Sequence, residues 1–190
     1  LERGIDLIEL APEERGGTHV PEGARARGAI ELQGVTLAYR DEADAPPALD
    51  HVTLSIEAGE TVALVGPSGA GKSSLVNLLP RFFEPTRGSI ALDGVPLPEW
   101  RLDALRRQFA LVSQDVVLFN DSVAANVALG APKDAAIDRE RVRDALRSAN
   151  LLDFVEGLPQ GLDTDIGHNG NQLSGGQRQR IAIARAIYKD

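Results

Sequence analysis

The sequence predicts an α/β fold in which a parallel-sheet core is joined to an N-terminal antiparallel β subdomain and to a helical subdomain. Three observations carry this prediction. Short segments with β-type patterning run from Ala29 to Val65, and the last of them, Thr61–Val65, is continuously apolar, as is typical of a strand buried on both faces of a parallel sheet. A glycine-rich loop and a helical pattern follow it directly. Residues 122–158 have mainly helical patterning.

The remaining elements follow from periodicity and turn residues. Alternating or short apolar runs predict strands at 30–32, 35–39, 49–56, 61–65, 89–92 with Val95, and 109–112. Helical patterns predict helices at 72–79, 102–108, within 122–158, and at 174–189. Asp93-Gly94 predicts a turn between two strands. Asp138 is expected to cap a helix whose apolar face holds Val142, Leu146 and Ala149.

Composition excludes several classes of protein. A chain of 190 residues is long enough to bury one sizeable core. Acidic residues outnumber basic ones by 28 to 20, a balance that disfavours nucleic acid as a partner. The absence of cysteine excludes disulfide scaffolds and thiolate zinc sites. No apolar run reaches the roughly 20 residues that a membrane-spanning helix needs.

The loop after the expected strand 61–65 matches the pattern G-x-x-x-x-G-K-[ST]. The match and the residue after it comprise Gly66, Pro67, Ser68, Gly69, Ala70, Gly71, Lys72, Ser73 and Ser74. Glycines allow successive backbone N–H groups to converge on phosphate oxygens near the start of the following helix. In this pattern Lys72 reaches the β- and γ-phosphates, and the Ser73 hydroxyl ligates Mg²⁺. The loop therefore predicts a P-loop NTPase core, the alternative being a glycine-rich turn with a solvated lysine.

Two competing motifs fail on spacing. The dinucleotide-binding pattern G-x-G-x-x-G requires glycine where Ser74 stands. The hydrolase pattern G-x-S-x-G requires glycine where Ala70 stands. Both alternatives are therefore disfavoured.

A second glycine-rich helix start lies near the end of the sequence. Ser174 precedes Gly175, Gly176 and Gln177. A serine in this position caps backbone donors, and the glycines expose the N–H groups of the first turn. The residues alone leave two interpretations open: a second anion site, or a simply capped helix.

Taken together, these motifs resemble a known family. Leu173–Gln177 followed by Arg178–Arg180 resembles the signature sequence of ABC-transporter ATPase domains. Gln114, within Val112–Asp115, resembles the Q-loop of that family, and Tyr39 stands where the family has an aromatic residue that stacks on adenine. The resemblance covers about residues 29–190.

The resemblance implies a role for each residue. Tyr39 would stack on the adenine of ATP, although a tyrosine at a strand end is by itself more often a packing residue. Lys72 and Gln114 would be the catalytic residues, with Ser73 and Gln114 contacting Mg²⁺. In a head-to-tail dimer, the signature residues of one domain would close over the ATP of the second ATP-binding domain. These residues are Ser174, Gly175, Gly176 and Gln177. ATP binding and hydrolysis would then switch a transmembrane domain between access states.

The subtype resembles exporters. Only 58 residues separate Gln114 from Leu173, too few for the long coiled coil of the chromosome-maintenance relatives. Leu118–Val123 and Thr164–Gly170 resemble exporter segments, although His168 replaces the usual glutamate and is interpreted as a surface histidine, with a pH switch as the alternative. Among exporters, the sequence is most similar to lipid A exporters of the MsbA type, which implies a location at the cytoplasmic face of the inner membrane.

This resemblance also implies a domain organisation and a missing part. We expect residues 1–28 to be a linker from an upstream transmembrane domain, with a disordered end as the alternative, and 29–190 to be the ATP-binding domain, with a helical subdomain at about 120–172. The family continues with an apolar strand ending in Asp-Glu and with a switch histidine, and neither lies within these residues. We therefore expect a piece of a longer ATPase, alone nearly inactive in hydrolysis; the alternative is a module that binds ATP without hydrolysing it.

Overall fold

The computed structural model describes residues 16–23, 25–39, 46–129, 136–167 and 170–189. They form two compact units, Leu1–Phe109 and Ala110–Asp190, which are described separately. Among the described residues, no helix is both long enough and apolar enough to cross a membrane.

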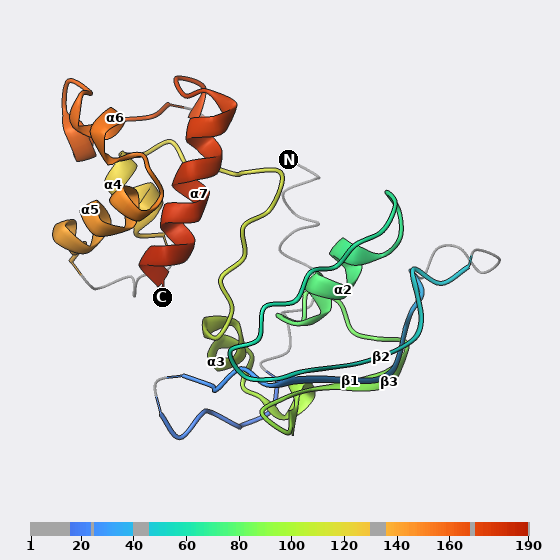
Figure 1. Ribbon diagram of the computed structural model, residues 1–190. Coiled ribbons are helices and arrows are strands. Elements are labelled where there is room, and N and C mark those ends of the chain that lie inside the picture. The colour runs from blue at the N-terminus through green and yellow to red at the C-terminus, as the bar shows by residue number, and fades with distance from the viewer. Residues whose placement is uncertain (1–15, 24, 40–45, 130–135, 168–169, 190) are drawn as a thin grey trace, which may run out of the picture. The chain divides into compact units, whose positions relative to one another are not determined.

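The first unit is built on a four-stranded antiparallel sheet. Its elements are β1 (Ile30–Leu37), β2 (Leu49–Ile56), α2 (Lys72–Leu78), β3 (Arg87–Leu92), β4 (Val95–Pro96), the 3₁₀ helix η1 (Leu97–Glu99) and α3 (Leu102–Arg107). The strand order is β2-β1-β3-β4, and Figure 1 shows the three longer strands side by side. Leu32 of β1 is paired with Leu54 of β2 and with Ile90 of β3. The predicted antiparallel β subdomain is thus confirmed.

An irregularity in β1 keeps its apolar residues on one face. Leu32, Val35 and Leu37 are all buried, which a strict alternation would not allow, because the spacing from Leu32 to Val35 is odd. The register shifts between Leu32 and Val35, and Gly34 has a φ of 58°. One bulged position therefore turns Val35 back toward the core.

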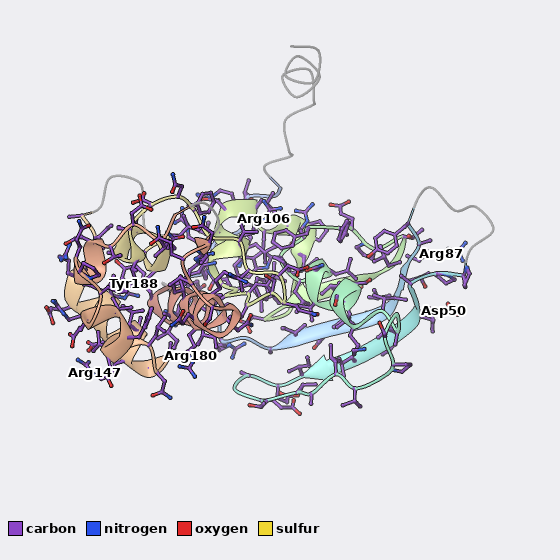
Figure 2. All side chains as sticks on the ribbon, turned by 90° about the horizontal axis from the view of Figure 1, so that it is seen from above. Asp50, Arg87, Arg106, Arg147, Arg180 and Tyr188 are labelled. Carbon is purple, nitrogen blue, oxygen red and sulfur yellow. The ribbon has the colours of Figure 1, made fainter. Side chains whose placement is uncertain are left out.

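One end of this sheet brings together the segments that will form the site. Both β2 and β3 begin at the end where β1 finishes, as the positions of Asp50 and Arg87 in Figure 2 show. Tyr39 follows β1 at this end. Buried residues of β1, β2 and β3 share one core with Leu75 and Leu78 of α2, so the sheet fixes the helix that follows the phosphate loop.

The described part of the expected linker is bound to the rest of the first unit, and we call residues 16–23 and 25–29 the N-terminal strap. The Gly17 N–H donates to the Trp100 carbonyl at 2.9 Å, and the His19 ring contacts the Trp100 ring edge-on at 4.5 Å. At the other end of the strap, the Asp93 carboxylate accepts the backbone N–H groups of residues 27, 28 and 29. Asp93 and Gly94 have φ of 52° and 79°, which is the geometry of a type I′ hairpin turn and confirms the predicted turn. An upstream domain stays a prediction.

The two segments predicted as buried parallel strands are not strands in the structure. Residues 61–65 and 109–112 have no strand assignment, and Val65 is 89% exposed. A parallel strand depends on hydrogen-bonded neighbours and on cover over both faces, and the described strands of the first unit pair only with one another. A continuous apolar run shows that a segment can be buried. Whether it forms a buried strand depends on the neighbouring strands that it can pair with.

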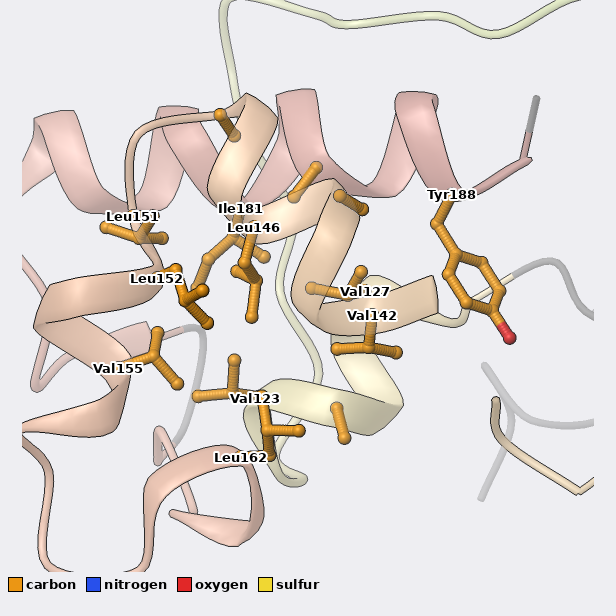
Figure 3. Close-up of a cluster of buried hydrophobic side chains, with 14 of the residues drawn as sticks. Val123, Val127, Val142, Leu146, Leu151, Leu152, Val155, Leu162, Ile181 and Tyr188 are labelled. Atoms are coloured by element: carbon orange, nitrogen blue, oxygen red, sulfur yellow. The ribbon is translucent and has the colours of Figure 1, made fainter. Parts of the chain in front are cut away.

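The second unit is helical, in agreement with the predicted fold class, and the bounds of about 120–172 for a helical subdomain stay a prediction. Its elements are α4 (Val123–Val127), α5 (Arg139–Ser148), α6 (Leu152–Glu156), η2 (Gly161–Asp163) and α7 (Gly175–Lys189). As predicted, the Asp138 side chain caps α5 by accepting the Arg141 N–H at 3.0 Å. Val142 and Leu146 of α5 are fully buried. Figure 3 shows them in the core with Ile181 of α7, surrounded by side chains of α4 and α6.

Candidate functional site

The phosphate loop has the backbone that its glycines permit. Gly69 and Gly71 have φ of 81° and 79°, a region that other residues rarely adopt. A Cβ on Gly71 would lie only 2.3 Å from the Ala48 carbonyl oxygen, whereas a Cβ on Gly69 would meet nothing within 4 Å. Helix α2 begins directly after Gly71, whose carbonyl accepts the Leu75 N–H at 2.9 Å. Gly71 is therefore fixed both by conformation and by close packing against the start of β2.

Lys72 lies over the loop that precedes it. Its ammonium donates to the carbonyl oxygens of Gly66 at 2.9 Å and of Pro67 at 2.7 Å. The Pro67 carbonyl also accepts the Ala70 N–H, which closes a turn around Ser68. This folded-back lysine places a positive charge at the loop, where the oxygens of a bound phosphate could replace the carbonyls as its partners. Ser73, the predicted Mg²⁺ ligand, is exposed on the first turn of α2.

Tyr39 lies beside the same helix. Its hydroxyl is 2.9 Å from the Ser74 hydroxyl, and its ring meets the Phe83 ring at a centroid distance of 5.6 Å and an interplanar angle of 89°. The Tyr39 side chain is 46% exposed. The structure thus brings Tyr39 to the P-loop helix across 35 residues of sequence. The contact with Phe83 was not predicted, because single-sequence patterning does not show which aromatic residues meet.

The other predicted site residues lie in the second unit. Gln114 is exposed and lines an open pocket of about 560 Å³ that it shares with Asn171, Gly175, Arg178 and others. The Q-loop residue and the start of the signature helix therefore line one hollow in this unit. Among the described residues, no group of three or more histidine or acidic side chains could hold a metal ion. A role of Gln114 toward Mg²⁺ stays a prediction.

The signature sequence forms a capping box at the start of α7. The Ser174 hydroxyl accepts the Gln177 N–H at 3.3 Å, and the Gln177 side chain accepts the Ser174 N–H at 2.8 Å. The next N–H, that of Arg178, donates to the Ser174 carbonyl at 3.0 Å. Within the described part of the chain, no hydrogen bond is recorded for the N–H groups of Gly175 and Gly176. The predicted cap is confirmed, and these two donors remain available to an external oxygen.

The two segments that resemble exporter sequences are neighbours in space. The Val123 N–H donates to the Thr164 carbonyl at 3.1 Å, and the Ile166 N–H donates to the Asp121 carbonyl at 3.2 Å. These two bonds join the segment after Gln114 to the segment before the signature. His168 lies outside the described residues, so its interpretation stays a prediction.

A buried polar residue holds the loop after Gln114, and sequence reasoning missed it. Asn126 is 1% exposed; its amide accepts the Phe119 N–H at 2.8 Å and donates to the Phe119 carbonyl at 3.0 Å. Arg185 of α7 donates to the backbone carbonyls of Asn126 and Val117. Burial lowers the pKa of the Arg185 guanidinium. A polar residue on an otherwise apolar helical face was the available signal.

Residues 49–190 match the sequence profile of the ABC transporter family. The chain belongs to that family. Family membership implies that this domain binds ATP, and the resemblance drawn from the phosphate loop, Gln114 and the signature sequence is confirmed.

Two curated relatives of the chain carry the same name. The chain is 57% identical over 190 residues to the ATP-dependent lipid A-core flippase of Polaromonas sp. and 61% identical over 198 residues to that of Cupriavidus metallidurans. Both alignments cover all of this chain, and they cover 31% of the first relative and 32% of the second. A solved bacterial Atm1-family ABC exporter with ATP bound superposes with a TM-score of 0.84 at 36% identity, covering all of this chain and 32% of that one. The chain thus spans about a third of the length of these proteins.

Proposed function

We propose that this chain is the ATP-binding motor domain of an ABC exporter, and that the whole protein hydrolyses ATP to move a lipid-like molecule, of the lipid A-core class, across a membrane. The observation that carries the proposal is the phosphate loop: Gly69 and Gly71 in left-handed conformations, Lys72 folded over the loop, and Tyr39 beside the same helix. The names of the relatives support the choice of substrate class. The whole protein would place this domain at the cytoplasmic face of the inner membrane, coupled to a transmembrane domain.

The chain's own residues would bind and orient the nucleotide. The N–H groups of the glycine-rich loop and the Lys72 ammonium would hold the phosphates, and Tyr39 would stack on the adenine. Bound Mg²⁺ supplies charge neutralisation at the β- and γ-phosphates, and the Ser73 hydroxyl and the Gln114 amide would hold it. The N–H groups of Gly175 and Gly176, at the positive end of α7, would contact the ATP of a second domain.

The proposal is tested by separating binding from turnover. We expect residues 1–190 to bind Mg-ATP but to hydrolyse it far more slowly than a form that also contains the Asp-Glu strand typical of the family, since a general base is typically worth about 10²–10⁴-fold in rate. Calorimetry measures the binding, and phosphate release measures the turnover. Equal turnover by the two forms would contradict the assignment of the base. Failure of residues 1–190 to bind ATP would contradict the proposed function itself.

Replacing Ser174 by arginine should prevent ATP-driven dimerisation. A long cationic side chain would fill the space in which the signature helix meets the phosphates of the partner domain, while the P-loop of the same chain keeps its residues. Light scattering with and without ATP, on a form extended beyond residue 190, measures the dimer. Ser174→Ala is the matched control: it removes the same cap, worth about 1 kcal/mol, without adding bulk. Dimers that persist in Ser174→Arg would count against a shared site.

A further inference from the structure

The ring of Tyr39 is held at two places by residues of two different segments. Its hydroxyl meets the Ser74 hydroxyl on α2, and its ring meets Phe83, in the loop after α2, at 89°. Both rings are accessible, Tyr39 at 46% and Phe83 at 42%. Neither contact is needed to fill the core of the unit, since neither ring is buried.

The two contacts restrain different motions. The hydroxyl oxygen of a tyrosine lies on the axis about which its ring turns, so the bond to Ser74 fixes where the ring ends but not which way its faces point. Phe83 contacts the ring itself, at an interplanar angle of 89°; turning the Tyr39 ring would alter this contact, so Phe83 opposes the rotation. The direction of the faces is what matters for stacking on a flat base.

We propose that Phe83 is a positioning residue for nucleotide binding, which sets the plane of Tyr39 so that one face of the ring is presented to the base. This inference rests on the proposed function, in which Tyr39 stacks on adenine. The perpendicular geometry fits the role, because a ring at 89° contacts at most one face of Tyr39 and leaves the other to the base. Phe83 itself does not have to touch the nucleotide.

The backbone before Phe83 is fixed well enough to carry this role. Helix α2 ends in a Schellman-type turn in which the Phe82 N–H donates to the Asn77 carbonyl at 3.1 Å, with Arg81 at a φ of 54°. The Arg106 side chain donates to the carbonyls of Pro80 and Arg81. The turn is thus tied to α3, and Phe83 leaves it at a defined position.

Phe82 provides a matched control. It is an exposed phenylalanine next in sequence, and its ring faces the Arg106 guanidinium at 5.4 Å. Among the described residues, the ring contact recorded for Tyr39 is with Phe83. Changing Phe82 therefore removes a comparable exposed ring without changing the partner of Tyr39.

The test compares two probes on the 190-residue chain by calorimetry: Mg-ATP, which carries a base, and magnesium tripolyphosphate, which carries none. We expect Phe83→Leu to weaken ATP binding by about 3- to 10-fold, the range for losing one aromatic pair, and to leave tripolyphosphate binding unchanged. Phe83→Tyr should restore ATP binding, and Phe82→Leu should alter neither probe. Equal losses in the two leucine variants, or an equal loss of tripolyphosphate, would overturn the proposal.

A double-mutant cycle shows whether Phe83 acts through Tyr39. In a Tyr39→Leu background, Phe83→Leu should cause no further loss of ATP affinity; an additive loss would show independent action and overturn the proposal. The chain has two tyrosines, Tyr39 and Tyr188. When both are replaced by 3-fluorotyrosine, Phe83→Leu should shift the fluorine NMR signal of Tyr39 and not that of Tyr188. Failure of the proposed function gives a different result: Tyr39→Leu would itself leave ATP affinity unchanged, or the unmodified chain would bind neither probe.

Discussion

Replacing Lys72 by alanine is expected to weaken ATP binding by at least about 100-fold. The ammonium is the positively charged side chain of the loop, and each charge-assisted hydrogen bond that it gives to a phosphate is worth about 1.5–3 kcal/mol. The fold should survive, because the carbonyls of Gly66 and Pro67 that Lys72 contacts are exposed and water can replace the ammonium as their donor. Calorimetry with a non-hydrolysable ATP analogue measures the loss.

Arg147→Ala is the control for the change in net charge. Arg147 is an exposed residue of α5 at the periphery of the second unit (Figure 2), and it forms an ion pair with Asp144. Its removal subtracts the same charge from the chain and touches no predicted site residue. Undiminished binding of the analogue by Lys72→Ala would refute the assignment of the phosphate loop, and an equal loss in Arg147→Ala would show that net charge alone is responsible.

Replacing Gly71 by alanine should destabilise the first unit by about 3 kcal/mol and abolish ATP binding. A left-handed backbone conformation costs a residue with a Cβ about 1–2 kcal/mol, and overpacking adds about 1–3 kcal/mol, because the new Cβ would lie 2.3 Å from the Ala48 carbonyl oxygen. Denaturant unfolding is followed by the fluorescence of Trp100, which is the only tryptophan of the chain and is buried in the core of the first unit.

Gly69→Ala separates the two causes. Gly69 has nearly the same φ as Gly71, 81° against 79°, but a Cβ there meets nothing within 4 Å. This variant should therefore lose about 1–2 kcal/mol from the conformation alone. If the two variants were equally unstable, the close packing of Gly71 against the start of β2 would carry no energy.

The elements that could be predicted from the sequence are those with local causes. Asp138 caps α5, Asp93-Gly94 makes a turn, and Ser174 with Gln177 closes the start of α7, each through contacts within a few residues. The phosphate loop was predictable for the same reason, since its glycines and Lys72 act on one another. The motif fixes the chemistry without reference to the rest of the chain.

The failures involve causes that lie far away in the sequence. Thr61–Val65 has the composition of a buried strand, but a parallel strand exists only when another strand accepts its hydrogen bonds. The bulge at Gly34 shifts the register of β1 against both of its neighbours, β2 and β3. The contact of Tyr39 with Phe83 joins residues 44 positions apart in the sequence, and that of Asn126 with Arg185 joins residues 59 positions apart. The periodicity of a sequence does not indicate which distant residues meet.

The N-terminal strap gives the first unit a mechanical property. Tension applied to the chain before residue 16 would not pass directly along the backbone to β1. It would first load the hydrogen bonds between the strap and the segment at Trp100, and then the Asp93 carboxylate. The segment from β3 to η1 therefore anchors the strap to the first unit, so that a pull on the strap would load this segment before it loads β1.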